Sequence, residues 1–512
     1  GKLLSLVDYT SAILYNELGI RKDDVILLSQ PNIPNVIILF YALNKIGAVA
    51  NMVHPFTPFD QLLDIYHKTN CKLAFVFEQR VAKEVDKFKD IVNSIYITRI
   101  EDFLPPLKKA SYHIFMNNKI RKKLLDYADF KYFYKLKTKN YSIEENMDCS
   151  KLSVLLHSGS TTGEPKIICH NDKAFNFIAS HACEFLDCTS EFIKGKGMLS
   201  VLPSFHGFGL CMGMHSPIVN RFASVLIPKF TVKKVCKAFN HFDIATSIGV
   251  PTMYQTLIDS DLFLKNKHVK NLHVAFAGGD TLPKRLQSDF NMILKLKGSR
   301  CQLFEGYGLT EVIAVNCVNT FKDNKVYSLG KPASDVKFKF IDDNGNEVEP
   351  NVIGEICIMS GSCMLGYYND EAATNSCLKD GWLHTGDLGY VDTDGFIHFS
   401  QRKKRVIKVS GVAVFPSEIE SFIMQNFPQI KEICAIEVPD EKLGHAIKII
   451  VSPVLNDSLL DEIREKCSSY LIRWAVPKEI SFMSELPRTL YGKINFTKLQ
   501  NDENVLRGVL HE

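Results

Sequence analysis

The residues with the clearest capacity for chemistry form a loop of hydroxyls and glycines that ends in a lysine. Residues 155–166 read LLHSGSTTGEPK and begin within an apolar, strand-like run at 152–156. Glycines let the backbone approach phosphate oxygens, hydroxyls and exposed N–H groups donate hydrogen bonds to them, and a lysine offsets their charge. We therefore predict a nucleotide-phosphate site made of Ser158, Gly159, Ser160, Thr161, Thr162, Gly163 and Lys166.

This loop differs from a Walker loop. A Walker loop has four residues between its glycines and continues directly into Gly-Lys-Ser/Thr. Here three residues separate Gly159 from Gly163, and Lys166 follows Glu-Pro. A loop rich in Ser, Thr and Gly is also typical of a simple flexible turn. The buried strand before it and the Pro-Lys after it favour phosphate.

Seven further segments carry polar or charged residues, in six of them together with glycine or proline, and each has an ordinary structural interpretation on its own. A lone histidine is usually satisfied in a core, whereas a lone glutamate or lysine is usually a surface charge. The segments are PSFHGFG (203–209), AGGD (277–280), FEGYGLTE (304–311), GWLHTGD (381–387), RKKR (402–405), KVSG (408–411) and LPRTLYGK (486–493).

Taken together and in this order, the segments resemble the motifs of the adenylate-forming superfamily of acyl-CoA synthetases, adenylation domains and firefly-type luciferases. The likeness covers nearly the whole chain and is closest in character to fatty-acid or aryl-acid CoA ligases. It implies an acid–thiol ligase that makes acyl-AMP and pyrophosphate from a carboxylic acid and ATP, then transfers the acyl group to coenzyme A. ATP, Mg²⁺ and coenzyme A are the implied ligands.

The resemblance also implies roles for individual residues. Lys493 is the implied catalytic lysine, His206 a gate beside the acyl pocket, and Thr310 a donor to the α-phosphate. Glu311 is the implied Mg²⁺ ligand, because a cation that bridges phosphates needs only one or two carboxylates. Nucleotide or coenzyme A contacts are implied for Gly278, Gly279, Asp280, Glu305, Gly306, Tyr307, Gly308, Asp387, Arg402, Lys404, Lys408 and Gly411.

Some of these residues have distinct implied tasks. Tyr307 lies between two glycines, so its ring has room to lie on adenine. Asp387 can accept both ribose hydroxyls, although the residues alone equally allow a cap for the local turn. Lys404 is the implied hinge about which the C-terminal part swings, so that Lys408 and Gly411 replace Lys493 at the site.

A few positions depart from the family pattern. Ser160 stands where relatives usually have Gly, Ile167 where a glycine often follows the lysine, and Asn495 where an arginine is common. We therefore expect the phosphate loop to differ in detail from that of relatives. Gly1 enters directly into what resembles the family's first helix, so the usual leading segment is expected to be absent or shortened.

Apolar residues alternate between helical and strand-like spacing up to about residue 335. Helices are predicted at 5–18 and 36–46, and strands at 24–29, Leu73–Phe77, 199–202, 224–227, 244–248 and Val274–Ala277. Strands that alternate with helices predict an α/β fold of largely parallel, helix-covered sheets.

The rest of the chain has a different pattern. Short alternating runs from 338 to 399, with turns at DNG (343–345) and TDG (393–395), predict antiparallel hairpins in a small β-barrel-like part. After the basic segment RKKR (402–405), which is expected to join two domains, the pattern predicts helices at 417–425 and 459–471 and strands at 433–438 and 447–451. We predict a large domain over 1–402, with its hairpin-rich subdomain at about 336–402, and a small mobile α+β lid domain over 403–512.

Composition excludes a nucleic-acid partner and a spanning segment. The 61 Lys and Arg residues nearly balance the 57 Asp and Glu residues, so the net charge of +4 gives no field for nucleic acid. The 14 cysteines lack the spacing of zinc or redox motifs and fit reduced thiols in a cytoplasmic protein. Residues 197–220 are uncharged but rich in Gly, Pro and His, so we expect a buried strand-and-loop passage in a soluble protein.

The segment 108–139 carries Lys and Arg among Tyr, Phe and Leu. Weak peripheral contact of a basic amphipathic helix with a membrane is one interpretation. A solvated helical excursion on the domain face is the other, and it is favoured.

Alternative functions follow from the same motifs. The acceptor of the acyl group could be the phosphopantetheine of a carrier protein, and a luciferase-type reaction is a more remote interpretation. A non-catalytic sensor of acyl-AMP or nucleotide is disfavoured, because Thr310, Glu311, Asp387, Arg402 and Lys493 are all retained. The segments expected around the acid, 206–214, 249–254 and 277–280, supply no cation for a second carboxylate and favour a neutral aliphatic or aromatic monoacid.

Overall fold

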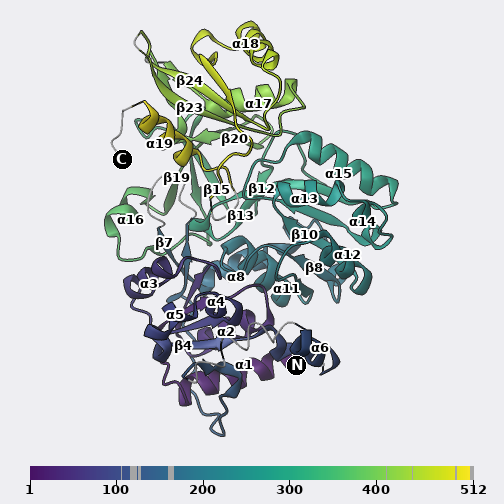
Figure 1. Cartoon of the computed structure of the whole chain (residues 1–512), viewed down its shortest axis with the longest axis vertical. Coiled ribbons are helices and arrows are strands. Elements are labelled where there is room, and N and C mark those ends of the chain that lie inside the picture. Colours follow the sequence, from purple (N-terminus) through teal and green to yellow (C-terminus); the bar gives the residue numbers. More distant parts are fainter. Residues whose placement is uncertain are drawn as a thin grey trace. The chain divides into compact units, whose positions relative to one another are not determined.

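The computed structural model describes residues 1–104, 106–115, 124, 129–158, 166–410, 412–440, 442–489 and 493–507. The chain forms two compact units (Figure 1). Unit 1 contains Gly1–Ser158, Lys166–Lys337 and Met359–Leu378, and unit 2 contains Phe338–Ile358 and the residues after Leu378. The predicted domain boundary after residue 402 stays a prediction, and unit 2 includes residues on both sides of it.

The first sheet of unit 1 is mainly parallel. Among the described residues its order is β17-β7-β6-β2-β1-β3-β4-β5. The strands are β1 (Val25–Ser29), β2 (Val49–Val53), β3 (Leu73–Phe77), β4 (Ile95–Thr98), β5 (Lys131–Tyr132), β6 (Leu152–His157), β7 (Ile167–Asn171) and β17 (Gly366–Tyr367). Only the pairs β6–β7 and β7–β17 of this sheet are antiparallel in the part of the chain described. Every residue of β1 and β2 is buried, as expected for parallel strands covered on both faces.

Helices α1 (Lys2–Asn16), α2 (Pro34–Lys45) and α3 (Phe59–Lys68) flank this sheet (Figure 1). Phe59 and Leu62 of α3 pack into one core with the strand residues Leu27 and Val76. The predicted helices at 5–18 and 36–46 and the strands at 24–29 and Leu73–Phe77 are therefore confirmed, with shifts of up to three residues at their ends.

The second sheet of unit 1 has the order β14-β13-β12-β11-β10-β8-β9 among the described residues. Its strands are β8 (Gly197–Ser200), β9 (Ala223–Leu226), β10 (Ile244–Gly249), β11 (Val274–Ala277), β12 (Gln302–Gly308), β13 (Val315–Val318) and β14 (Lys331–Pro332). The pairs from β9 to β12 are parallel, and β13 and β14 add antiparallel pairs at one edge. Helices α12 (Val232–His241), α13 (Pro251–Ile258) and α15 (Lys284–Leu296) share a core with these strands. The α/β prediction is confirmed.

The predicted strand-and-loop passage at 197–220 is confirmed for the strand β8. The prediction is wrong for the second half of the passage, which is helical. Phe208–His215 is a π-helix, and α11 (Ser216–Val219) continues from it. Gly209 follows a sharp turn, where an added Cβ would collide with the backbone oxygen of Pro203. The glycines thus permit a tight helical entry, and the apolar side chains that follow are buried.

The hairpin-rich subdomain forms as predicted in most of its length. Its strands are β15 (Lys337–Ile341), β16 (Gly354–Met359), β18 (Leu378–Lys379), β19 (Trp382–Val391) and β20 (Ile397–Arg402). The pairs β16–β19 and β19–β20 are antiparallel. Residues 359–378 are the exception, because they belong to unit 1, where β17 pairs with β7 and α16 (Glu371–Cys377) follows. A two-residue strand has too little alternation for its partner to be predicted.

The C-terminal part of unit 2 is an α+β arrangement, as predicted. β23 (Glu432–Asp440) pairs antiparallel with β24 (Gly444–Ser452), which pairs parallel with β25 (Glu479–Phe482). Helices α17 (Pro416–Asn426) and α18 (Ser458–Tyr470) pack on this sheet through Ile419, Ile423 and Ile463. The last helix, α19 (Phe496–Leu506), packs through Leu499 in a separate cluster.

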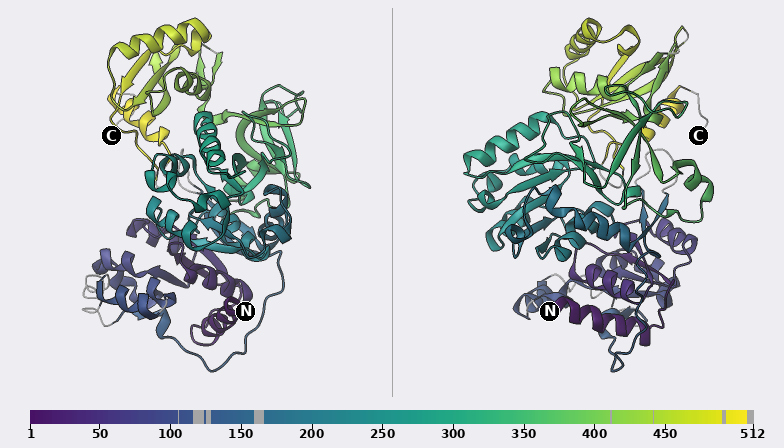
Figure 2. Two further views of the ribbon diagram at one scale, coloured as in Figure 1. Left: turned by 90° about the vertical axis from the view of Figure 1, so that its right-hand side faces the viewer. Right: turned by 180° about the vertical axis from the view of Figure 1, so that it is seen from behind.

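The basic segment 108–139 is not one helix. It contains part of α6 (Pro106–Phe115) and the strand β5, and residues 116–123 and 125–128 lie outside the described residues. The expected helical excursion is therefore wrong at β5, which pairs with β4. After β5 the chain runs without helix or strand from 137 to 148, visible as a long blue loop in the left view of Figure 2. Within the described ranges, no helix has both the length and the apolar character needed to cross a membrane.

Candidate functional site

The base of the predicted phosphate loop is closed by its own strands. Gly159, Ser160, Thr161, Thr162 and Gly163 lie outside the described residues. The Ser158 amide donates to the Lys166 carbonyl at 2.9 Å, and the Lys166 amide donates to the Ser158 hydroxyl oxygen at 2.9 Å. These bonds continue the β6–β7 ladder and fix the backbone of Lys166, whose side chain is exposed.

Thr310 and Glu311 begin a short helical turn, Thr310–Val312, directly after β12. His170 of β7 donates from Nε2 to the Thr310 carbonyl at 2.7 Å. Burial lowers the pKa of His170 to about 4, so the ring is neutral and its proton is assigned to Nε2. The Glu311 carbonyl accepts from the Met364 amide at 2.8 Å. The backbone of the predicted phosphate and metal ligands is thus held from two neighbouring segments.

Tyr367 connects the predicted metal ligand to the predicted phosphate lysine. Its hydroxyl donates to Oε1 of Glu311 at 3.0 Å, and the Lys166 ammonium lies 4.1 Å from the centre of its ring. Glu311 is partly exposed, and among the described residues its second carboxylate oxygen has no hydrogen-bond partner. A single accessible carboxylate fits Mg²⁺ that takes its other ligands from phosphates and water.

A strained turn follows Glu311 and lies against the histidine segment, residues 203–209. Ile313 has φ of +64°, and the Ala314 amide donates to the Val312 carbonyl at 2.7 Å. This backbone conformation costs a β-branched residue about 1–3 kcal/mol, so surrounding contacts must hold it. Glycine is required on both sides, because a Cβ at Gly207 or Gly308 would collide with the carbonyl oxygen of Ile313 or Ala314, respectively. The histidine segment therefore packs directly against the turn after Glu311.

The predicted adenine-side residues line the carboxyl ends of β11 and β12. Glu305 accepts from the Leu282 amide at 3.0 Å, and burial raises its pKa to about 7. Gly279 has φ of +81°, and a Cβ on Gly278 would lie 2.9 Å from the Phe208 ring. The Asp280 carboxylate accepts from the next amide along the chain, that of Thr281.

The aromatic and histidine predictions have different surroundings. Tyr307 is buried in β12 opposite Cys317, with Gly306 packed against Val315 and Val318. His206 is half-buried before the π-helix, with its ring centre 5.9 Å from that of Phe205. His206 is thus not a fully buried core histidine. The adenine and gate roles of the two residues stay predictions.

In unit 2, Asp387 and Arg402 contact each other. They are register partners across β19 and β20 and form an ion pair, with 2.9 Å between Arg402 Nε and Asp387 Oδ1. The Asp387 side chain is 2% exposed and that of Arg402 is 51% exposed. The Asp387 amide donates to the Thr385 hydroxyl oxygen at 3.1 Å, so Thr385 caps the local turn.

The remaining predicted lysines are exposed residues of unit 2. Lys404 lies in the single turn Lys403–Arg405, beside Arg405, which pairs with Glu420 at 2.6 Å. Lys408 lies on the short strand Ile407–Val409, and Gly411 is outside the described residues. The Lys493 carbonyl accepts from the Thr489 amide at 2.8 Å.

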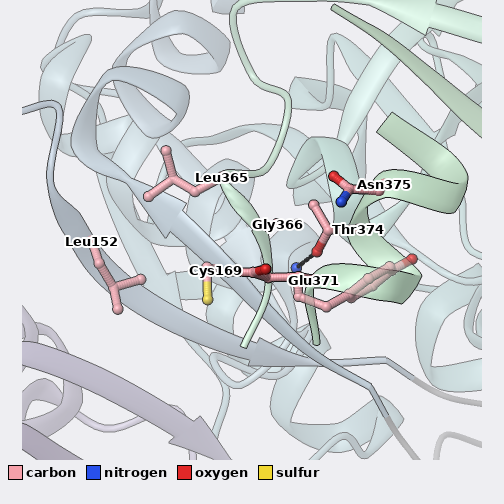
Figure 3. Close-up of a pocket in the computed structure, with 8 residues that line it drawn as sticks. Leu152, Cys169, Leu365, Gly366, Glu371, Thr374 and Asn375 are labelled. Atoms are coloured by element: carbon pink, nitrogen blue, oxygen red, sulfur yellow. Dashed lines mark hydrogen bonds between the residues drawn. The ribbon is translucent and has the colours of Figure 1, made fainter. Parts of the chain in front are cut away.

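A pocket of about 520 Å³ lies beside β17 in unit 1 (Figure 3). Its lining residues are Leu152, Cys169, Leu365, Gly366, Tyr367, Glu371, Thr374 and Asn375. The Thr374 hydroxyl oxygen accepts from the Tyr367 amide at 2.9 Å, the bond drawn in Figure 3. None of the residues that the sequence assigns to the site lines this pocket. Tyr367, which lines it, also contacts the predicted site residues Glu311 and Lys166.

Sequence reasoning missed His170 and Tyr367, the two side chains that hold Thr310 and Glu311. A polar residue inside a buried strand was a usable signal for His170, because β7 reads IICHN with its centre buried. Tyr367 had a weaker signal, a tyrosine after a glycine in a loop-like run.

Comparison with family models agrees with this arrangement. Residues 1–368 match the model of the AMP-binding enzyme family, and residues 418–493 match the model of its C-terminal domain. The chain belongs to the AMP-binding enzymes. This family is the adenylate-forming family that its motifs resemble, and the prediction of an AMP-forming acid–thiol ligase is confirmed at that level.

Two bacterial relatives span most of this AMP-binding enzyme. A long-chain-fatty-acid–CoA ligase of Salmonella typhimurium is 29% identical over 96% of this chain and 88% of its own length. One from Bacillus subtilis is 29% identical over 95% of this chain and 86% of its own length.

Solved structures share the fold at lower identity. The anthranilate CoA ligase AuaEII in complex with anthranoyl-AMP has a TM-score of 0.79 at 21% identity, over 99% of this chain and 92% of that one. The o-succinylbenzoate coenzyme A synthetase MenE of Bacillus subtilis, in complex with ATP and magnesium ion, has a TM-score of 0.78 at 21% identity, over 97% and 93%.

Proposed function

We propose that this AMP-binding enzyme activates a neutral aliphatic or aromatic monocarboxylic acid with ATP and Mg²⁺, and transfers the acyl group to coenzyme A. The observation that carries the proposal is the contact network of Lys166, Glu311 and Tyr367 beside the Thr310 turn. It joins a cation, a hydroxyl and an accessible carboxylate in one place, which suits a metal-bound triphosphate.

The first half-reaction follows from the charges involved. A carboxylate oxygen attacks the α-phosphorus of ATP, the bond from that phosphorus to the bridging oxygen breaks, and pyrophosphate leaves with the bonding electrons. When bound, Mg²⁺ would neutralise phosphate charge, and Glu311 would hold it. Lys166 and the hydroxyl of Thr310 would contact phosphate oxygens, and Lys493 would lie between the acid and the α-phosphate.

The second half-reaction replaces AMP by a thiol. The sulfur of coenzyme A attacks the acyl carbonyl, the bond to the AMP oxygen breaks, and the thiol proton is released. Lys493 has to withdraw before this step, and a rotation about Lys404 would exchange it for Lys408 and Gly411. The exposure of Lys404, Lys408 and Lys493 is compatible with such an exchange.

The acid class is proposed from the chain's own residues and from its relatives. The π-helix that follows His206 includes Leu210, Met212 and Met214, which are buried and apolar. An acid bound beside this helix would meet apolar surroundings, which favour an uncharged acyl chain. Two relatives of similar length are long-chain-fatty-acid–CoA ligases, which supports a fatty acid as the first candidate.

A pyrophosphate-release screen tests the proposal. The purified chain is mixed with ATP, Mg²⁺ and each acid from acetate to palmitate, benzoate and cinnamate. We expect release with at least one long-chain or aryl acid, followed by thioester formation when coenzyme A is added. Release without thioester formation on coenzyme A, but with transfer to a holo-carrier protein, would reassign the acceptor. No release with any acid would contradict the proposal.

A further inference from the structure

Tyr367 lies where two predicted ligand groups of opposite charge meet. It is the second residue of β17 and pairs with Ile168 of β7. Ile168 lies two positions after Lys166 in the chain. The Leu365 amide donates to the Cys169 carbonyl and the Tyr368 amide to the Ile167 carbonyl, both at 2.8 Å. Backbone bonds on either side therefore fix the direction of the Tyr367 side chain.

The two ends of this side chain contact different partners. The hydroxyl donates to Glu311 Oε1 at 3.0 Å, while the face of the ring lies 4.1 Å from the Lys166 ammonium. A hydrogen bond to one oxygen of a carboxylate orients the other oxygen. An aromatic face attracts an ammonium group without using any of its N–H donors. Both charged groups thus keep their capacity for further ligands.

The segment that carries Tyr367 also holds the backbone of Glu311. The Met364 amide donates to the Glu311 carbonyl, three residues before the tyrosine whose hydroxyl reaches the carboxylate. The backbone and the carboxylate of Glu311 are therefore both held from one short segment, residues 364–367.

We propose that Tyr367 is a positioning residue that sets the Glu311 carboxylate for Mg²⁺ and the Lys166 ammonium for phosphate. This role rests on the proposed nucleotide chemistry of the same site. It assigns a function to a residue that touches neither the acid nor the reacting phosphorus. Tyr367 also lines the adjacent pocket, together with Gly366 and Thr374.

Two substitutions separate the two contacts. Tyr367→Phe keeps the ring beside Lys166 and removes the bond to Glu311, whereas Tyr367→Leu removes both. Tyr368→Phe is the matched control, because it deletes the hydroxyl of the next residue, which donates to the Thr69 carbonyl at 3.4 Å. The probe is α,β-methylene ATP, which cannot release pyrophosphate, and its binding is measured by calorimetry with and without Mg²⁺.

We expect Tyr367→Phe to weaken binding of the analogue about tenfold in the presence of Mg²⁺ and to leave metal-free binding unchanged. Tyr367→Leu should weaken binding under both conditions, and Tyr368→Phe under neither. In a Glu311→Gln background, Tyr367→Phe should cause no further loss. A merely structural role would lower affinity equally with and without the metal.

Several results would overturn the role of Tyr367. They are unchanged Mg²⁺-dependent affinity in Tyr367→Phe, a full additional loss in the Glu311→Gln background, or no binding of the analogue to the unsubstituted chain. Failure of the proposed function is distinct from these. A chain that binds the nucleotide in a Tyr367-dependent way but releases no pyrophosphate with any acid retains the positioning role and loses the ligase assignment.

Discussion

The candidate residues of unit 1 and those of unit 2 are held in opposite ways. In unit 1, Thr310 and Glu311 are fixed by bonds from His170, Met364 and Tyr367. In unit 2, the side chains of Lys404, Lys408 and Lys493 are exposed. Lys404 lies on a single turn and Lys408 on a three-residue strand. A site for a triphosphate gains from groups fixed in advance, because no reorganisation is then needed when charge develops.

Exposure of the lysines suits a different requirement. A cation that must enter the site for one half-reaction and leave before the next cannot be buried in a permanent network. Asp387 is the exception in unit 2, because its side chain is 2% exposed and bound by Arg402. The comparison therefore separates the groups predicted to hold the nucleotide from the lysines predicted to enter and leave the site.

The largest expected effect is that of Lys493, one of the lysines predicted to enter and leave the site. Lys493→Ala should lower ATP–pyrophosphate exchange by about 1000-fold, because a cation that meets the developing negative charge is lost. Far-UV circular dichroism should be unchanged, since the side chain is exposed. Lys498→Ala, at an exposed lysine of α19 that pairs with Asp502, is the control. Normal exchange by Lys493→Ala would remove Lys493 from the adenylation step.

The second prediction concerns the fixed group of unit 2. Asp387→Asn should raise the KM for ATP about 10- to 100-fold, because hydrogen bonds to a charged acceptor are lost. KM for the acid should not change. Asp343→Asn removes a 90%-exposed carboxylate that also pairs with a basic residue, Lys403, and should leave ATP binding as it is. Equal effects of the two substitutions would remove Asp387 from the nucleotide site.

The third prediction tests the exchange itself. Lys404→Pro restricts the backbone at the predicted hinge, so thioester formation should slow about tenfold more than adenylation does. Lys404→Ala keeps the backbone freedom and should preserve the ratio of the two half-reactions. Stopped assays of acyl-AMP and acyl-CoA in single turnovers measure both. Equal slowing of both steps would contradict a hinge at this residue.

The smallest effect concerns a fixed group on the adenine side. Burial raises the pKa of Glu305 to about 7 from a usual value near 4.5, so the folded state favours the protonated form. Its contribution to stability is complete below about pH 4.5 and is lost as the pH rises through about 7. Between about pH 6 and 7.5 the chain should lose about 1 kcal/mol relative to Glu305→Gln.

Urea unfolding of both proteins at the two pH values measures this difference. The paired design cancels the contribution of Glu78, whose pKa burial also raises to about 7. Identical pH dependence of the two proteins would show that Glu305 is ionised in the folded chain.

Local pattern was sufficient for most of the elements and for the family. The spacing of apolar residues predicted the α/β part, the antiparallel hairpins and the C-terminal elements α17, β23, β24 and α18, because each depends on residues close in sequence. It did not predict β25 or α19. The motifs identified the family, and their residues Lys166, Thr310 and Glu311 do lie in unit 1 around one contact network. The roles of these residues in catalysis stay predictions.

Tertiary structure alone decided what holds those residues. Tyr367 reaches Glu311 only because a two-residue strand from beyond residue 360 pairs with β7, and so short a strand has no periodic signal. His170 reaches the Thr310 carbonyl across 140 positions of sequence. The sequence determines which groups carry charge and which local segments are helical or extended, whereas long-range pairing determines which charged groups become neighbours, because that pairing depends on the packing of the whole unit.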